Sequence, residues 1–96
     1  VLGDMKELGK YSIEAHEAIG NLVGERVDIL VTVGSSAKLI ADSASEKIKA
    51  SNIYSFDNSE DAKIKVQEII QEGDVILIKG SRSMKMEVIL EEIVAR

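Results

Sequence analysis

The sequence contains no cysteine and only one histidine in 96 residues. Without cysteine, a disulfide framework, a thiolate nucleophile and a cysteine-based zinc site are all excluded. One histidine is also too few for a histidine-rich metal site. We therefore expect no metal site in this chain, and the missing disulfides agree with a cytoplasmic protein.

Strongly basic segments and long apolar runs are missing as well. Lys and Arg number 12 against 17 Asp and Glu, which gives a net charge of −5, and no five like charges are consecutive. A nucleic-acid binder needs positive charge over its phosphate contacts, so we expect no nucleic-acid partner. The longest apolar run, Val75–Ile78, is far shorter than the roughly 20 residues that cross a bilayer. No membrane insertion is expected.

The common phosphate-binding motifs are also absent. No Gly-x-x-x-x-Gly-Lys-Ser/Thr segment occurs, since Lys79 precedes its glycine, and no Gly-x-Gly-x-x-Gly follows a strand-like segment. Nucleotide phosphates are therefore not held mainly by this chain. No nucleophile, base and acid set can be assembled from the spacings, so we assign no catalytic residue.

The apolar pattern predicts a single α/β domain over residues 1–96. Four strand-like segments alternate with four helix-like segments, and no linker-like stretch separates them. Continuous apolar runs predict parallel strands that are covered on both faces. The expected strands are Val1–Leu2, Asp28–Val33, Asn52–Phe56 and Val75–Ile78, of which Asn52–Phe56 should lie nearest an edge. Because Val1–Leu2 reads as the end of a strand already under way, we expect a domain truncated at its N-terminal side.

Helix signals follow each of these strands. The first helix is expected to start at Ser12, whose hydroxyl would cap it, and the second to follow Gly34 and end near Ile48. Asn58 is expected to cap the third helix, and Gly73 to stop it at its C-terminus. The inward positions are His16, Ile19, Gly20 and Val23 in the first helix; Leu39, Ile40 and Ala44 in the second; Ala62, Val66, Ile69 and Ile70 in the third; and Met86, Ile89, Leu90 and Ile93 in the last.

The loops after parallel strands meet at one edge of the sheet, where ligands bind in open α/β folds. Here these loops are residues 3–9, 34–36 and 79–85. The last carries the most chemistry, because Gly80 is followed by two hydroxyls and accompanied by three cations. These features predict an anion site in which Arg82 grips a carboxylate or phosphate through two parallel N–H bonds. Alternatively, a serine caps the next helix and the cations are merely solvated. The residues concerned are Lys79, Gly80, Ser81, Arg82, Ser83 and Lys85.

Asp4 directly follows the first strand, so its carboxylate is expected to point toward the same crevice. It would accept hydrogen bonds from a sugar hydroxyl or steer a cation there. The alternative is an ordinary turn aspartate. Glu7 is expected only to help order this loop. His16 falls on the apolar face of its helix, which favours a buried, hydrogen-bonded residue over a catalytic base.

Three motifs in this order resemble the C-terminal domain of Mur ligases. They are Gly-Asp-Met-Lys-Glu-Leu-Gly at 3–9, His-x-x-x-Gly at 16–20 and Lys-Gly-Ser-Arg at 79–82. The resemblance spans nearly the whole chain and is closest to the ligases that join D-alanyl-D-alanine to UDP-N-acetylmuramoyl-tripeptide with ATP and magnesium. It implies a three-layer, Rossmann-like domain of a cytoplasmic enzyme of peptidoglycan synthesis, without the opening segment of that domain.

The resemblance also implies roles for individual residues. Asp4 matches an acidic residue near the nucleotide ribose, and the loop Lys79–Ser83 matches the wall that receives the dipeptide carboxylate. Glu7 and His16 take supporting roles. Lys6 stands where the family often has an apolar residue, and it is assigned no function. ATP and Mg are expected mainly on a central domain outside this chain, so the chain alone is expected to be inactive.

Two alternatives remain open from the sequence. One is a stand-alone, non-catalytic α/β binding module of the receiver-like kind, which would need a cluster of acids at the strand ends. The other is the equivalent domain of another ligase in the Mur superfamily, which the Lys-Gly-Ser-Arg loop disfavours.

Overall fold

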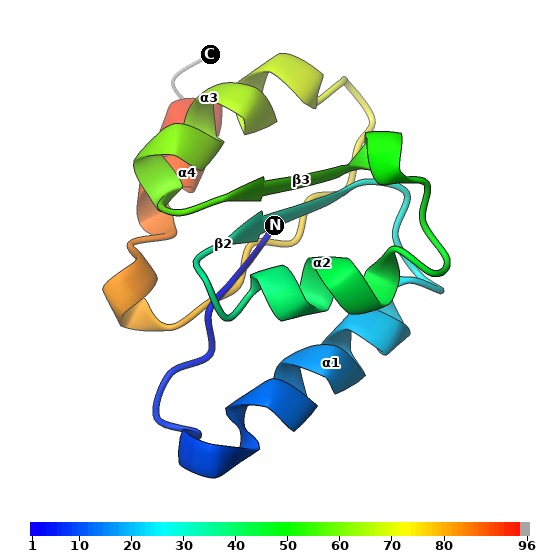
Figure 1. The fold of residues 1–96 in the computed structure, drawn as a ribbon. Helices are drawn as coiled ribbons and strands as arrows, with labels where there is room; N and C mark the ends of the chain where they lie inside the picture. Colours follow the sequence, from blue (N-terminus) through cyan, green and yellow to red (C-terminus); the bar gives the residue numbers. More distant parts are fainter. Residues whose placement is uncertain (95–96) are drawn as a thin grey trace.

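A three-stranded parallel sheet forms the centre of the computed structural model, which describes residues 1–94 (Figure 1). Its strands are β1 (Leu2–Gly3), β2 (Leu30–Val33) and β3 (Ile53–Phe56), in the order β1-β2-β3. β2 pairs with both neighbours, from Leu2 opposite Thr32 on one side to Leu30 opposite Ile53 on the other. The α/β class is confirmed, and β3 is an edge strand as predicted.

Helices cover both faces of this sheet, which makes three layers (Figure 1). α1 and α2 lie together on one face, and α3 and α4 lie on the other. The α-helices are α1 (Ser12–Val23), α2 (Lys38–Ala44), α3 (Ser59–Ile69) and α4 (Glu87–Val94), and three short 3₁₀ helices are η1 (Gly9–Tyr11), η2 (Ala50–Asn52) and η3 (Arg82–Met84). No helix within residues 1–94 has the length and apolar character needed to cross a bilayer.

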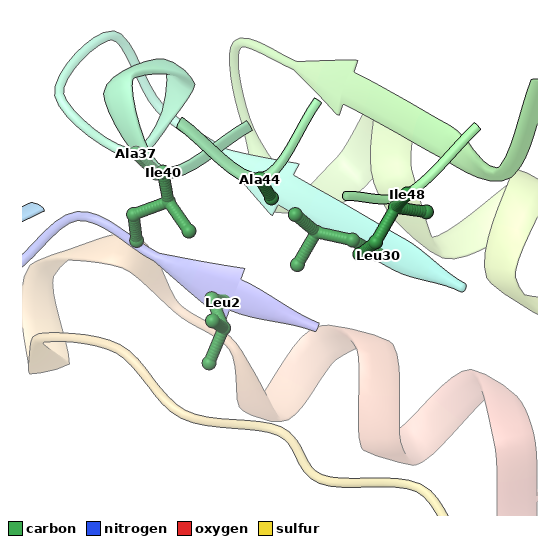
Figure 2. Close-up of a cluster of buried hydrophobic side chains, with 6 residues drawn as sticks. All are labelled: Leu2, Leu30, Ala37, Ile40, Ala44 and Ile48. Carbon is green, nitrogen blue, oxygen red and sulfur yellow. The ribbon is translucent and has the colours of Figure 1, made fainter. Parts of the chain in front are cut away.

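Alternation along β2 divides the core into two clusters. Leu30 points to the α1/α2 face, whereas Val31 and Val33 point to the α3/α4 face. Figure 2 shows the first cluster, which consists of Leu2, Leu30, Ala37, Ile40, Ala44 and Ile48. The second cluster consists of Val31, Val33, Ala62, Val66, Met86 and Ile89. Each large buried side chain contributes roughly 1.5–3 kcal/mol by leaving water, so the two clusters hold the layers together.

The prediction of a strand at Val75–Ile78 is wrong for the structure as described. Residues 75–78 have no regular secondary structure, and Val75 is fully exposed. Only Lys79 forms a parallel bridge, opposite Leu2. This segment nevertheless runs beside β1, because the Val1 amino group donates to the Leu77 carbonyl (2.7 Å) and Lys79 N–H donates to the Val1 carbonyl (3.0 Å). A strand needs a partner along its length, and β1 offers only two residues.

Three details of the helix predictions are also corrected. Ser12 begins α1, but no side-chain cap is formed there, and its hydroxyl instead lies 3.3 Å from His16 Nδ1. α2 ends at Ala44 rather than near Ile48, although Ile48 N–H still donates to the Ala44 carbonyl. Leu90 is half exposed, because the buried side of α4 is centred on Ile89.

The expected start of α3 is confirmed, whereas its expected end at Gly73 is not. The Asn58 side chain accepts a hydrogen bond from Asp61 N–H (2.9 Å), which satisfies a backbone donor that a helix start leaves free. The helix ends earlier, at Ile69, because Ile70 is extended, so Gly73 (φ = +94°) lies in a turn beyond the helix and does not stop it. α3 is thereby placed with its N-terminus at the carboxyl ends of the strands.

Candidate functional site

A polar groove of about 510 Å³ lies at the carboxyl ends of all three strands. Its walls come from the loop after β1, the loop after β2, the start of α3 and the turn at η3. We call this region the carboxyl edge. The lining residues are Asp4, Lys6, Gly34, Ser35, Asp57, Asn58, Ser59, Glu60, Ser83, Met84 and Lys85. Hydroxyls, carboxylates and two ammonium groups line one space, so it suits a ligand with several polar groups.

Asp4 forms part of this groove although its side chain is almost completely buried. Its exposed fraction is 2%, and its two carboxylate oxygens have different partners. Oδ1 accepts the backbone N–H of Ala37 at 2.5 Å, at the start of α2, and Oδ2 lies 3.3 Å from Lys6 Nζ. A carboxylate at a helix N-terminus is favoured by the helix dipole and by the free backbone N–H groups. Asp4 therefore anchors α2 to β1.

Gly34 forms the wall against which the Asp4 carboxylate packs. A Cβ atom at Gly34 would lie only 2.5–2.6 Å from the Cγ, Oδ1 and Oδ2 atoms of Asp4. The φ angle of Gly34 is +108°, which side-chain-bearing residues rarely adopt. Glycine is thus required here for two separate reasons, and the absence of its side chain leaves the space that the carboxylate occupies.

His16 holds the loop that follows β1 through a hydrogen bond. The side chain is fully buried, and Nε2 accepts the backbone N–H of Met5 at 3.0 Å. Because Nε2 accepts, the ring proton lies on Nδ1, which is 2.6 Å from the Ser12 carbonyl oxygen. The ring joins the start of α1 to the residue after Asp4. This geometry is that of a buried hydrogen-bonded residue, and the ring does not line the groove.

The turn at residues 80–84 is attached directly to the Asp4 loop. Ser81 N–H donates to the Asp4 carbonyl (3.0 Å), and Ser81 Oγ accepts the backbone N–H of Lys6 (2.7 Å). Gly80 allows this approach, because a Cβ there would lie 3.0 Å from the Cα of Gly3. The structure therefore brings together the two loops that the sequence analysis proposed as one site.

The predicted anion-binding residues separate into different environments. Ser83 lines the groove, and Arg82 is exposed beside it at the start of η3. Lys79 pairs with β1 through its backbone, and its side chain is exposed. The Ser81 hydroxyl binds the backbone of Lys6, as described above, and does not cap η3. Glu7 is exposed, with φ = +65°, and does not line the groove.

The wall formed by the start of α3 was not predicted as part of the site. Asn58 and Ser59 lie there between two acids, Asp57 and Glu60. Glu60 accepts a hydrogen bond from Lys63 Nζ (2.8 Å), and this bond raises the pKa of Lys63 above its usual value. The rule that loops after parallel strands share one edge could have found this wall, since Asp57 directly follows β3.

Lys6 is another groove residue that sequence reasoning missed. Its side chain is about half exposed, and its ammonium group pairs with Asp4 Oδ2. The only feature of the sequence that pointed to Lys6 was its position two residues after Asp4. That spacing alone does not show whether the lysine side chain turns toward the carboxylate or into solvent.

Comparison with known proteins shows which family this chain resembles. Residues 1–82 match the family model described as "Mur ligase, glutamate ligase domain". Three curated relatives share the name UDP-N-acetylmuramoyl-tripeptide–D-alanyl-D-alanine ligase. The proteins from Bacillus subtilis and Buchnera aphidicola are 32% and 31% identical, each over 98% of this chain, and that from Haemophilus influenzae is 34% identical over 90%.

A solved structure agrees with these matches. The crystal structure of MurF from Acinetobacter baumannii superposes with a TM-score of 0.81 and 27% identity, over 100% of this chain. The match uses 22% of that structure, and 21%, 20% and 19% of the Bacillus, Buchnera and Haemophilus proteins. This chain therefore spans about a fifth of the length of the relatives that it matches.

Proposed function

Because this chain belongs to the Mur ligase family, we propose that it forms the C-terminal domain of a cytoplasmic, ATP-dependent ligase of peptidoglycan synthesis. The proposed reaction joins D-alanyl-D-alanine to UDP-N-acetylmuramoyl-tripeptide. One observation carries this proposal: relatives that bear the name of that ligase match 90–98% of this chain. A stand-alone receiver-like module is not favoured by these matches.

The groove is the proposed place where the nucleotide and the incoming dipeptide meet this domain. Asp4 is assigned to the nucleotide, and the loop Lys79–Ser83 to the carboxylate of the dipeptide. The hydrogen bond between Ser81 N–H and the Asp4 carbonyl supports this assignment, because it fixes the two loops at one edge of the sheet. Glu7 and His16 have supporting roles, and the Met5 N–H bond to His16 gives that role a physical basis.

ATP fits this groove in part. The hydroxyl, amide and carboxylate groups along its walls suit the hydroxyls of a ribose. In the part of the chain that is described, no three His, Cys, Asp or Glu side chains are grouped as a metal ion would need. We therefore assign the magnesium ion and most phosphate contacts to the rest of the ligase, and we expect this chain alone to be inactive.

The physical contribution of this domain would be to position the dipeptide. A cationic loop that neutralises the carboxylate fixes one end of the dipeptide, so that its amine is held near the activated tripeptide carboxyl group. Orientation of this kind lowers the entropy cost of a reaction between two molecules. Preoriented donors keep the charge stabilised without rearrangement during the reaction.

Arg82 provides the direct test of this proposal. We would replace the matching segment of the Bacillus subtilis relative with this chain and measure ATP-dependent ligation of the dipeptide. Arg82→Ala should raise the KM for D-alanyl-D-alanine by roughly tenfold or more, because a charged hydrogen bond is worth about 1.5–3 kcal/mol. Arg26→Ala, which removes an exposed arginine at the opposite edge of the sheet, is the matched control.

Asp4→Asn tests the nucleotide assignment in the same chimeric ligase. It should raise the concentration of ATP needed for half-maximal rate. An unchanged dipeptide KM in the Arg82 variant rejects the carboxylate assignment, and an unchanged ATP dependence removes Asp4 from the nucleotide site.

A further inference from the structure

Lys6 and Asp4 form a pair in which one partner is fixed and the other is free to move. The side chain of Asp4 is 3% exposed, whereas that of Lys6 is 49% exposed. Gly34 packs directly against the carboxylate, and Ala37 N–H holds Oδ1, so the carboxylate has little room to rotate. The backbone of Lys6 is held by Ser81 Oγ, which leaves only the lysine side chain mobile.

The two oxygens of Asp4 are therefore not equivalent. Oδ1 faces the start of α2 and accepts the hydrogen bond from Ala37 N–H within the fold. Oδ2 pairs with a lysine that itself lines the groove, so Oδ2 lies on the groove side of the carboxylate. Within the described residues, no buried side-chain oxygen or nitrogen lacks a hydrogen-bond partner. A ligand that binds Oδ2 must thus displace the Lys6 ammonium group and donate a hydrogen bond to this oxygen in its place.

We propose that Lys6 is a specificity-determining residue of this site, because its ammonium group competes with a ligand hydroxyl for Asp4 Oδ2. This inference rests on the proposed function, in which Asp4 meets the sugar of the nucleotide. The competition weakens binding of the hydroxyl-bearing ligand, and removal of the lysine amine strengthens it. A half-exposed ion pair is weak, which makes Lys6 displaceable by a neutral hydroxyl donor.

The test measures binding of a neutral ligand, so that attraction between lysine and phosphate has no part in the result. Adenosine and 2′,3′-dideoxyadenosine are titrated into the 96-residue chain and into its Lys6→Met variant, and the dissociation constants are obtained from amide NMR shifts. Lys6→Met should bind adenosine roughly two- to fivefold more tightly than the original chain. It should show no such gain for the dideoxynucleoside, which lacks the competing hydroxyls.

Two further variants control for charge and for folding. Lys49→Met removes one exposed positive charge away from the groove and should leave the adenosine affinity unchanged. Lys6→Arg keeps a cation beside Asp4 and should show no gain in affinity, which provides a result even if Lys6→Met unfolds.

Several outcomes overturn the proposal. They are weaker or unchanged adenosine binding by Lys6→Met, an equal gain for the dideoxynucleoside, or no binding of adenosine to either protein at millimolar concentration. Failure of the proposed ligase function is recognised separately, by the Arg82 and Asp4 variants of the chimeric ligase. If Arg82→Ala and Asp4→Asn impair ligation as expected but Lys6→Met binds adenosine no more tightly, only the role of Lys6 is rejected.

Discussion

The two ends of the sheet differ in the residues that line them. At the carboxyl edge, hydrogen bonds join loops that are far apart in the sequence, and the polar groups meet in a groove. At the other end, which we call the amino edge, residues 27–29 and 73–77 surround a mainly apolar hollow of about 570 Å³. Val75 and Leu77 are exposed there. The difference shows that the loops, rather than the strands, determine whether an edge of the sheet presents polar or apolar groups.

Among the loop substitutions, the largest expected effect comes from filling the space beside Asp4. Gly34→Ala should lower the free energy of unfolding by about 3 kcal/mol, because it combines backbone strain with loss of the bond between Asp4 and Ala37. Gly73→Ala at the amino edge is the matched control. Its φ is also positive, but no atom lies within 4 Å of the added Cβ, so only strain of about 1–2 kcal/mol is expected. Equal losses in urea denaturation would contradict the comparison.

The anchor itself can be weakened without adding bulk. Asp4→Asn keeps the shape of the side chain but removes its charge, and it should cost about 1–2 kcal/mol in urea denaturation. The amide of Ala37 should then exchange faster with deuterium than the amides of β3, because a neutral amide oxygen holds it less strongly than the charged carboxylate does. Uniform acceleration across the chain would argue against a local anchor.

The amino edge should tolerate substitutions that a packed strand does not. Val75→Lys is expected to change the unfolding free energy by no more than about 0.5 kcal/mol, because Val75 is fully exposed. In contrast, Ile89→Ala in the core of the α3/α4 face should cost about 2–5 kcal/mol. A loss of several kcal/mol for Val75→Lys would show that this segment is packed in solution.

The smallest effect concerns the ion pair between Glu25 and Lys47, which follow α1 and α2. The hydrogen bond and the charge of Lys47 lower the pKa of Glu25 below its ordinary value of 4.5. Glu25 thus adds stability above the unfolded pKa, and this contribution disappears as the pH falls through the folded pKa. Lys47→Met should raise the pKa of Glu25 toward 4.5 in an NMR titration, and an unmoved titration would show that the pair is not formed.

Much of the fold could be predicted because the relevant signals are local. The apolar run within Asp28–Val33 and the capping residue Asn58 each specify an element within a few positions. Both elements are observed, although the strand begins at Leu30 rather than at Asp28. Val75–Ile78 has an equally apolar sequence, yet it forms no strand in the described structure. Strand formation depends on a partner supplied elsewhere in the chain, and that information is not in the segment itself.

Less of the site than of the fold could be predicted from the sequence. The convergence of the Asp4 loop with Ser81 was predicted from the parallel topology, and Gly3 and Gly80 show why it is sterically possible. The direction of individual side chains was not predicted. Asp4 uses one carboxylate oxygen inside the fold, and Lys6 turns back onto the other. Both outcomes depend on distances of a few ångströms between loops.

The contact between Gly3 and Lys79 also has a consequence for the order of folding. Gly3 N–H donates to the Lys79 carbonyl at 2.8 Å, so this bond closes a loop that contains most of the chain. The entropy cost of closing a loop grows with its length, whereas α1, β2 and α2 come together from near neighbours in the sequence. We therefore expect the groove to assemble in the last stage of folding, after both layers that flank it have formed.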